Sequence, residues 1–326
     1  MPCYRQVRLQ DIHLTDRTYT LNPFSQEPDE SLLQSIRSVG ILHPPLLLEK
    51  QDASFTILSG RRRIAAYLQI CNTQEQKKEE GHDHITALTL TLSRNGETPK
   101  NQHHLLTTLL QHQLLGGSLT VIEQAVFFQK AMLLALEEQD VLALLPLLGL
   151  KAKPHIPKEL LALLDLAPTV QLGLHKGIIA QRSGKKLSRF SPEDQELLAQ
   201  VIDEYQLGGS KQQKVIDRFV QLTQREKLPI QVLLTRWRKG EKDKQLNGPQ
   251  RTNSLLRWLD RECQPRLTQA EDEFRRFCCQ LQLPAGVRLD HSLSFEEEQI
   301  TLSLDFRGKE ELIRIWPQLE ALLRQE

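Results

Sequence analysis

Apolar and polar positions alternate in some parts of the N-terminal third and recur at helical spacing in others. Residues 85–92 (ITALTLTL) and residues 6–12 (QVRLQDI) alternate in the way that predicts half-buried strands. The apolar run at residues 55–58 predicts a buried strand. Apolar residues recur every three or four positions over residues 30–39, and Asp29 before them is a suitable N-cap, which predicts a helix. This region is therefore predicted to mix strands and helices.

The pattern changes further along the chain. From residue 116 to about residue 235 the apolar positions follow helical spacing only. Residues 236–253 are polar, with six Lys or Arg against two acids, and predict a linker with a local charge of +4. The remaining residues predict two strands and two helices, at 287–293, 299–306, 268–282 and 309–324.

Two strands and two helices bury too little apolar surface to be stable alone. We therefore expect a second copy to complete this module in a homodimer, with packing back onto the helical part as the alternative. The fold class is predicted to be α+β: a mixed domain at 1–115, a helical domain at 116–235, the linker at 236–253 and a small ββα-type module at 254–326.

Composition excludes only a few classes of protein. Of 326 residues, 39% are hydrophobic and the net charge is +1, so any surface that binds nucleic acid must be local. The five cysteines are odd in number and form no CxxC, which argues against a disulfide framework or a zinc site. The polar N-terminus and the absence of an apolar run of 18 residues predict a cytoplasmic protein with no membrane partner.

The stretch LSGRRRIAAYL places Gly60 and three arginines, Arg61, Arg62 and Arg63, at the start of a predicted helix. Cations are unfavourable there because the first turn carries the positive pole of the helix dipole. Guanidinium groups and free backbone N–H groups at a helix start favour phosphate, so the pattern predicts an anion site. The alternative is that these arginines are solvated or pair with the acids of residues 72–83.

Around these arginines, SIRSVGILHPPLLLEK and FTILSGRRRIAAYL resemble the N-terminal domain of the ParB family of chromosome and plasmid partition proteins. The matching residues are Ser35, Ile36, Gly40, Pro44, Gly60, Arg62, Arg63 and Ala66. The resemblance implies a nucleotide pocket that binds CTP with Mg²⁺, and it assigns the phosphates to Gly40, Gly60, Arg61, Arg62 and Arg63. Arg61 stands where the family usually has Glu, and Ala65 where it has Arg.

A third motif of the family aligns where the helical part begins and places His112 and Gln113 at a Glu–Asn pair that the family ties to magnesium and hydrolysis. Neither residue is a carboxylate, the ligand that Mg²⁺ prefers. The sequence therefore favours binding a nucleotide over hydrolysing it. It assigns no catalytic residue and no metal ligand.

Basic residues gather after Gly149, at the start of another predicted helix, and a second group follows one or two helices later. Such a helix start suits the major groove and DNA phosphates, although a solvated surface is the alternative. The segment from residue 147 resembles the family's helix-turn-helix. The predicted DNA-binding residues are Lys151, Lys153, His155, Lys158, Arg182, Lys185 and Lys186.

Together these observations predict a dimeric, nucleoid-associated DNA-binding protein acting in chromosome or plasmid partition, with DNA and a partition ATPase as partners. One alternative is a transcriptional regulator that uses the fold as a scaffold without nucleotide switching. A second is a nuclease or another phosphate-handling enzyme of the same fold.

Overall fold

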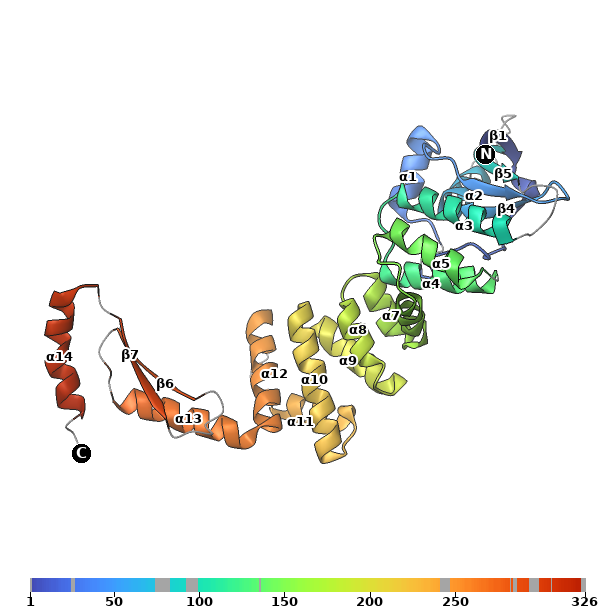
Figure 1. The fold of residues 1–326 in the computed structure, drawn as a ribbon. Coiled ribbons are helices and arrows are strands. Elements are labelled where there is room, and N and C mark those ends of the chain that lie inside the picture. Colours follow the sequence, from blue (N-terminus) through green and yellow to red (C-terminus); the bar gives the residue numbers. More distant parts are fainter. Residues whose placement is uncertain are drawn as a thin grey trace. The chain divides into compact units, whose positions relative to one another are not determined.

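The computed structural model divides into two compact units, residues 1–204 and 205–326 (Figure 1). The described residues are 2–24, 27–73, 83–91, 99–134, 136–240, 247–281, 283, 286–292, 299–305 and 307–323. Most of the charged segment predicted at 72–83 lies outside them. In the described residues no helix is long and apolar enough to cross a membrane.

The first unit contains a mixed five-stranded sheet in the order β1-β5-β3-β4-β2. Strand β1 pairs antiparallel with β5, β5 parallel with β3, β3 antiparallel with β4, and β4 parallel with β2. The strands are β1 Cys3–Arg8, β2 Ile12–His13, β3 Leu46–Glu49, β4 Phe55–Ser59 and β5 His84–Thr91.

The sheet curves strongly because β1 and β2 lie on its opposite edges. Only the 3-10 helix Leu9–Asp11 connects them, a span of roughly 10–14 Å. Four strand spacings in a flat sheet would require about 19 Å. The sequence prediction of one strand over residues 6–12 is therefore wrong, since the alternating pattern covers two strands and the turn between them.

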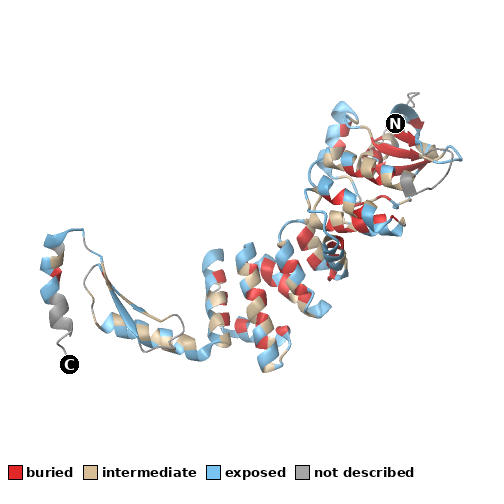
Figure 2. Ribbon diagram, viewed as in Figure 1, coloured by how far each residue is buried: buried red, intermediate tan, exposed pale blue. Residues whose placement is uncertain are grey.

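One helix packs against this sheet, and a second helix packs on the first through apolar residues. Helix α1 (Glu30–Val39) begins at Asp29, whose carboxylate accepts from the Leu32 N–H at 2.9 Å, so the predicted cap is confirmed. Helix α2 (Arg61–Thr73) packs on α1 through a cluster that includes Ile36 and Ala66. Figure 2 shows the central strands as the most buried part of this layer.

The rest of the first unit is helical. Helix α4 has Phe127 and Phe128 fully buried and contacts α5, α6 and α7. Its first turn is closed by a capping box between Thr120 and Glu123. The helices are α3 Pro99–Leu114, α4 Val121–Leu133, α5 Glu138–Leu144, α6 His155–Leu161, α7 Pro168–His175, α8 Gln181–Leu187 and α9 Pro192–Glu204, with 3-10 turns at Leu145–Leu148 and Ala162–Asp165.

In the second unit, two helices enter the polar segment that the sequence predicted as a linker. Helix α11 reaches Gly240, and α12 begins at Gly248 after a capping box between Asn247 and Gln250. The buried Thr252 hydroxyl donates to the Tyr205 carbonyl at 3.0 Å, which ties the first turns of α12 to the unit. The helices are α10 Gly209–Glu226, α11 Ile230–Gly240, α12 Gly248–Cys263 and α13 Pro265–Gln280.

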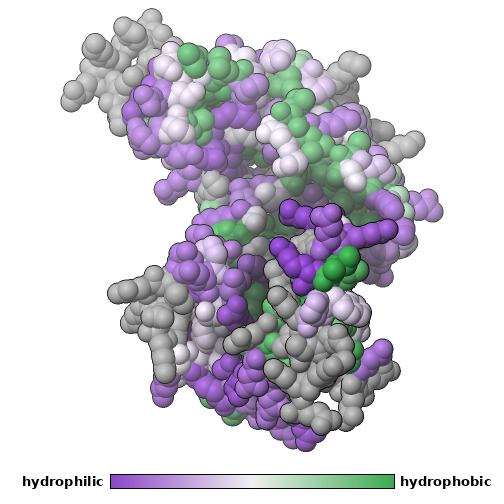
Figure 3. Space-filling model, turned by 90° about the vertical axis from the view of Figure 1, so that its left-hand side faces the viewer, coloured by the Kyte–Doolittle hydropathy of each residue, from purple (hydrophilic) through white to green (hydrophobic). Residues whose placement is uncertain are grey.

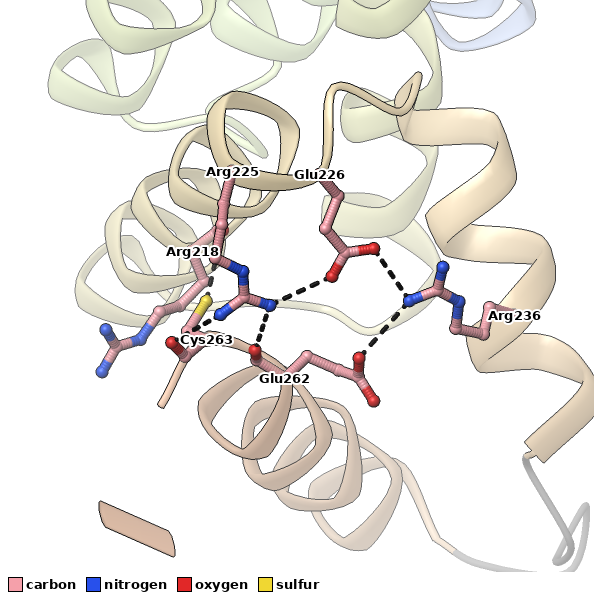
Figure 4. Close-up of polar contacts among 6 residues, drawn as sticks. All are labelled: Arg218, Arg225, Glu226, Arg236, Glu262 and Cys263. Atoms are coloured by element: carbon pink, nitrogen blue, oxygen red, sulfur yellow. Dashed lines mark hydrogen bonds and ion pairs between the residues drawn. The ribbon is translucent and has the colours of Figure 1, made fainter. Parts of the chain in front are cut away.

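An ion-pair network joins α10, α11 and α12 (Figure 4). Glu226 accepts from Arg225 and from Arg236, both at 3.0 Å. Arg225 also donates to the carbonyl oxygens of Glu262 and Cys263, at 2.5 and 2.9 Å, and so satisfies the end of α12. Ion pairs therefore stabilise the packing of the three helices in addition to their apolar contacts.

The last elements are the antiparallel pair β6 (Val287–His291) and β7 (Ile300–Leu304) and the helix α14 (Lys309–Leu323). Among the described residues here, only Val287 and Ile315 form a buried cluster. Large apolar side chains stay exposed, namely Phe277, Ile300, Leu302, Ile313 and Trp316. Figure 2 shows α13 and the strand pair as exposed or intermediate, and Figure 3 shows apolar residues in patches between hydrophilic ones on the face it draws.

Candidate functional site

The three arginines of the sequence motif follow β4 at a tight turn. Gly60 lies at φ +92°, and a Cβ on it would approach the Cβ and Cα of Pro45 at 2.8 and 2.9 Å. Only glycine fits both the backbone conformation and this close approach. The turn therefore fixes where α2 begins and where Arg61, Arg62 and Arg63 start.

Gly40, the fifth predicted phosphate-binding residue, lies away from the arginine turn in the sequence, at the end of α1. It ends α1 at φ +74°, and its N–H donates to the Ile36 carbonyl at 2.9 Å. A Cβ on it would meet nothing within 4 Å. Among the described residues that line the cavity below, Gly40 is absent, whereas the other four predicted phosphate-binding residues are present.

A cavity of about 360 Å³ opens beside the arginine turn. Its walls come from the segment before α1, the end of β4, the start of α2, the end of α3 and the start of α4, all within the first unit. The lining residues are Tyr19, Thr20, Leu21, Asn22, Leu32, residues 57–63, Gln113, Leu119 and Glu123. The sequence motif is thus part of a concave site of ligand size.

Each arginine reaches a different loop. Arg61 donates to the carbonyl oxygens of Leu14 and Asp16. Arg63 donates to the carbonyl oxygens of His43 and Pro44. These bonds hold two loops against the start of α2.

Arg62 is the arginine with an ion pair. It binds the Asp29 carboxylate at 2.8 Å and the Glu27 carbonyl at 3.3 Å. The bonds to Asp29 lower the pKa of that carboxyl: first the Leu32 N–H, then the Ser31 hydroxyl and Arg62. The positive charge of Arg62 is therefore compensated inside the chain.

Arg61 and Arg63 have no such compensation. Within the part of the chain that the structure describes, neither guanidinium has a carboxylate at ion-pair distance. Burial lowers the pKa of Arg63, and burial followed by the charge of Arg17 lowers that of Arg61, which Asp16 partly offsets. Partly buried cations without an ion-pair partner are unfavourable, so an anion in the cavity would be stabilised by them.

His112 and Gln113 lie at the end of α3, next to this site. Gln113 lines the cavity. Burial, then the charges of Arg63 and His43, lower the pKa of His112. Two buried nitrogens, Arg61 Nε and His112 Nδ1, have no hydrogen-bond partner among the described residues.

The residues present do not fit a magnesium ion. Glu123 is the single carboxylate among the described lining residues, and its Oε2 already accepts the Thr120 N–H at 2.9 Å. No group of three His, Cys, Asp or Glu residues in the described segments could hold a metal. Since Mg²⁺ prefers carboxylate oxygens, we assign no step to a metal, and no carboxylate cluster of the kind a metal-dependent nuclease uses is found there.

The first group of predicted DNA-binding residues lies on and before α6. The 3-10 turn Leu145–Leu148 ends at Gly149, and α6 starts at His155 without a side-chain cap. Pro157 and Leu160 face the core of the unit. Lys151, Lys153, His155 and Lys158 are all exposed, on α6 or in the segment just before it.

The second group lies on α8, with Arg182 and Lys185 exposed and Lys186 half-buried. Lys185 forms an ion pair with Glu159 of α6, and this bond lowers the pKa of Glu159. The two predicted groups are therefore neighbours. The sequence analysis missed Glu159, an acid that neutralises one of the seven predicted cations.

Sequence analysis also missed the residues that hold the segment before α1. Lys130 of α4 donates to the carbonyl oxygens of Arg17 and Thr18, at 3.2 and 2.6 Å. His175 of α7 bonds Asn22 at 3.3 Å and Thr120 at 3.0 Å. These contacts join residues 55 to 153 positions apart, so no local pattern in the sequence indicates them.

Comparison with known proteins defines the class of the first part of the chain. Residues 4–92 match the family model of the ParB N-terminal domain. The chain therefore carries a ParB N-terminal domain, and the resemblance drawn from the arginine motif is confirmed. The predicted α+β class is confirmed as well, with a mixed sheet first, many helices next and a strand pair near the end.

Two solved structures similar to this chain are of C-terminally truncated ParB from Caulobacter crescentus. One, in complex with the centromeric parS site, is 17% identical, with 64% of this chain and 96% of that chain covered and a TM-score of 0.34. The other, in complex with CTP-γ-S, is 18% identical, with 61% and 98% covered and a TM-score of 0.25. No curated protein sequence matches the chain.

Proposed function

We propose that this chain is a partition-type DNA-binding protein that binds nucleotide phosphates in the cavity beside Arg61, Arg62 and Arg63. One observation carries the proposal: the cavity is lined largely by residues of the ParB N-terminal domain, and two of its arginines, Arg61 and Arg63, have no carboxylate partner among the described residues. Phosphate oxygens supply the missing negative charge and accept bidentate N–H bonds.

Three further features support a nucleotide. The cavity volume of about 360 Å³ falls within the range of small-molecule sites. The first N–H groups of α2 lie at its wall and suit an anion. Apolar lining residues such as Leu21, Leu32 and Leu119 offer a surface for the rest of the molecule. CTP is the nucleotide that the family resemblance implies.

The exposed cations of the first group are proposed to meet DNA phosphates. Lys151, Lys153, His155 and Lys158 are exposed on or just before α6. Arg182 is exposed on α8, the helix whose Lys185 pairs with Glu159 of α6. Lys185 contributes less, because Glu159 already pairs with it.

A second copy of the chain is proposed to cover the exposed apolar residues of the last module, giving a homodimer. A partition ATPase and the nucleoid follow as partner and location from the family resemblance.

The nucleotide proposal is tested by titrating the full-length chain with labelled CTP, ATP and GTP, with and without duplex DNA. We expect at least one nucleotide to bind, and Arg63→Ala to weaken it. Arg236→Ala is the matched control, since that arginine has two carboxylate partners in the second unit. If no nucleotide binds, the proposal fails.

The DNA proposal is tested by the salt dependence of duplex binding. Lys151→Ala, Lys153→Ala and Lys158→Ala together should reduce the slope of log K against log salt by roughly 0.9 for each lost phosphate contact. A control with the same loss of charge replaces Lys227, Lys239 and Lys309, which are exposed in the second unit. An equal loss in both triple variants would refute the assigned surface.

A second candidate function, a DNA-binding regulator without nucleotide switching, is favoured by one specific observation. All three arginines already donate to backbone carbonyls of three loops, which is a structural use of their N–H groups. In that case Arg63→Ala lowers thermal stability and no nucleotide alters DNA binding. The same titrations therefore separate the two candidates.

A further inference from the structure

We infer that the cavity binds nucleotide phosphates without a divalent metal ion. The inference rests on the proposed function and adds the way in which the phosphate charge is neutralised. Arg61, Arg63 and the neighbouring His112 take the place that a metal with carboxylate ligands would occupy.

The charges around the cavity favour this arrangement. Three guanidinium groups line the cavity and one of them, Arg62, is neutralised by Asp29. The single lining carboxylate in the described segments, Glu123, has one oxygen engaged in the cap of α4. A divalent cation beside Arg61 and Arg63 would meet repulsion, and the described lining offers it at most one carboxylate.

The end of α3 offers hydrogen-bonding groups instead of carboxylate ligands. His112 precedes the lining residue Gln113, and burial followed by the charge of Arg63 lowers its pKa, which favours the neutral imidazole. An imidazole can donate to phosphate, whereas a hard ion such as Mg²⁺ prefers oxygen. The local chemistry is therefore that of an anion site.

Two atoms lack a partner on this side of the domain. Arg61 Nε and His112 Nδ1 are buried and form no hydrogen bond among the described residues. A buried polar atom without a partner is costly, and an acceptor beside it removes the cost. Arg61 lines the cavity itself, and phosphate oxygens are acceptors of the required kind.

The first test compares nucleotide binding in EDTA and in excess Mg²⁺, using labelled CTP, ATP and GTP on the full-length chain. We expect the dissociation constant to change by less than about threefold between the two buffers. Binding that requires Mg²⁺ overturns this inference and leaves the proposed function standing. Binding in neither buffer overturns both.

The second test installs a carboxylate. His112→Glu places a negative charge near Arg63, so affinity in EDTA should fall at least tenfold and recover in part with Mg²⁺. His104→Glu is the matched control, because His104 is exposed on the same helix. Unchanged affinity of His112→Glu in EDTA overturns the inference. Gln113→Glu, which lines the cavity, serves as the second variant if His112→Glu does not fold.

Discussion

Two arginines of the first unit, Arg61 and Arg63, differ from the paired arginines of the second unit. In the second unit, Arg218 and Arg236 each have a carboxylate partner, at 2.9 Å and 3.0 Å. In the first unit, Arg61 and Arg63 donate only to backbone carbonyls among the described residues. An arginine whose charge is neutralised within the chain needs no further partner, whereas one that is not neutralised remains available to an external anion.

Helix dipoles sharpen this difference. Arg225 donates to the last carbonyls of α12, the negative end of that helix, where a cation is favourable (Figure 4). Arg61, Arg62 and Arg63 occupy the first turn of α2, the positive end, where cations are unfavourable. The position of Arg61 and Arg63 at the start of the helix and their lack of a carboxylate partner among the described residues therefore both favour binding of an external anion. The following predictions test the contrast, beginning with the largest effect.

Replacing Gly60 should disturb the arginine turn most. In Gly60→Ala the added Cβ meets the backbone of Pro45 at a positive φ, so we expect the free energy of unfolding to fall by about 3 kcal/mol. Gly40→Ala shares the positive φ but meets no atom within 4 Å, and about 1 kcal/mol is expected. Chemical denaturation measures both, and equal losses would contradict the role of Pro45.

Removing an unneutralised arginine should affect ligand binding far more than removing a neutralised one. Arg63→Ala deletes a charged donor and should weaken nucleotide binding by about 10- to 100-fold. Arg236→Ala should leave the affinity unchanged and lower the free energy of unfolding by under about 1 kcal/mol, because the pair is largely exposed. Calorimetric titration and melting of both variants provide the readout. Similar affinities for the two would remove the basis of the contrast.

Removing the Asp260 carboxylate should leave Arg218 without its ion-pair partner, as Arg61 and Arg63 are among the described residues of the cavity. Asp260 pairs with Lys214 at 2.8 Å and with Arg218, which is only 19% exposed, at 2.9 Å. Asp260→Ala is expected to cost about 1 kcal/mol of stability and to leave nucleotide affinity unchanged. Asp272→Ala, which removes an exposed pair with Arg275, is the control and should cost less. A larger loss in the control would contradict this assignment.

The smallest effect should come from Asp29, the carboxylate that neutralises Arg62. Asp29→Asn keeps a good helix cap and removes only the charge, so nucleotide binding should tighten by about twofold. The pKa of Asp29 is held below its ordinary value in the folded protein. Its stabilising contribution is therefore present above about pH 4 and is lost as the pH falls through the lowered pKa. Melting between pH 2 and 6 should show a weaker pH dependence in Asp29→Asn than in the parent chain.

Local patterns in the sequence predicted the local structure well. The cap at Asp29, the end of α1 near Gly40 and the strand at 84–91 follow from capping and alternation, which act over a few residues. The first turn of α12 was missed because its residues are polar and its stabilising bond goes to Tyr205. A pattern of neighbours along the chain contains no information on such distant contacts.

The candidate site shows the same limit. The sequence indicated the arginine motif and its preference for phosphate, since residue type and helix position are local facts. It gave no sign that Arg61 reaches Leu14 or that Lys130 reaches Thr18. Those bonds use backbone carbonyls, which every residue has, so side-chain identity does not reveal them.

The position of β1 and β2 on opposite edges of the sheet has a practical consequence for handling the protein. Residues 3–13 supply both edge strands of the sheet, one on each side. A chain shortened at its N-terminus by these residues would expose the long strand β5 on one side and the fully buried strand β4 on the other. Open strand edges pair with other chains, so N-terminal trimming should promote aggregation.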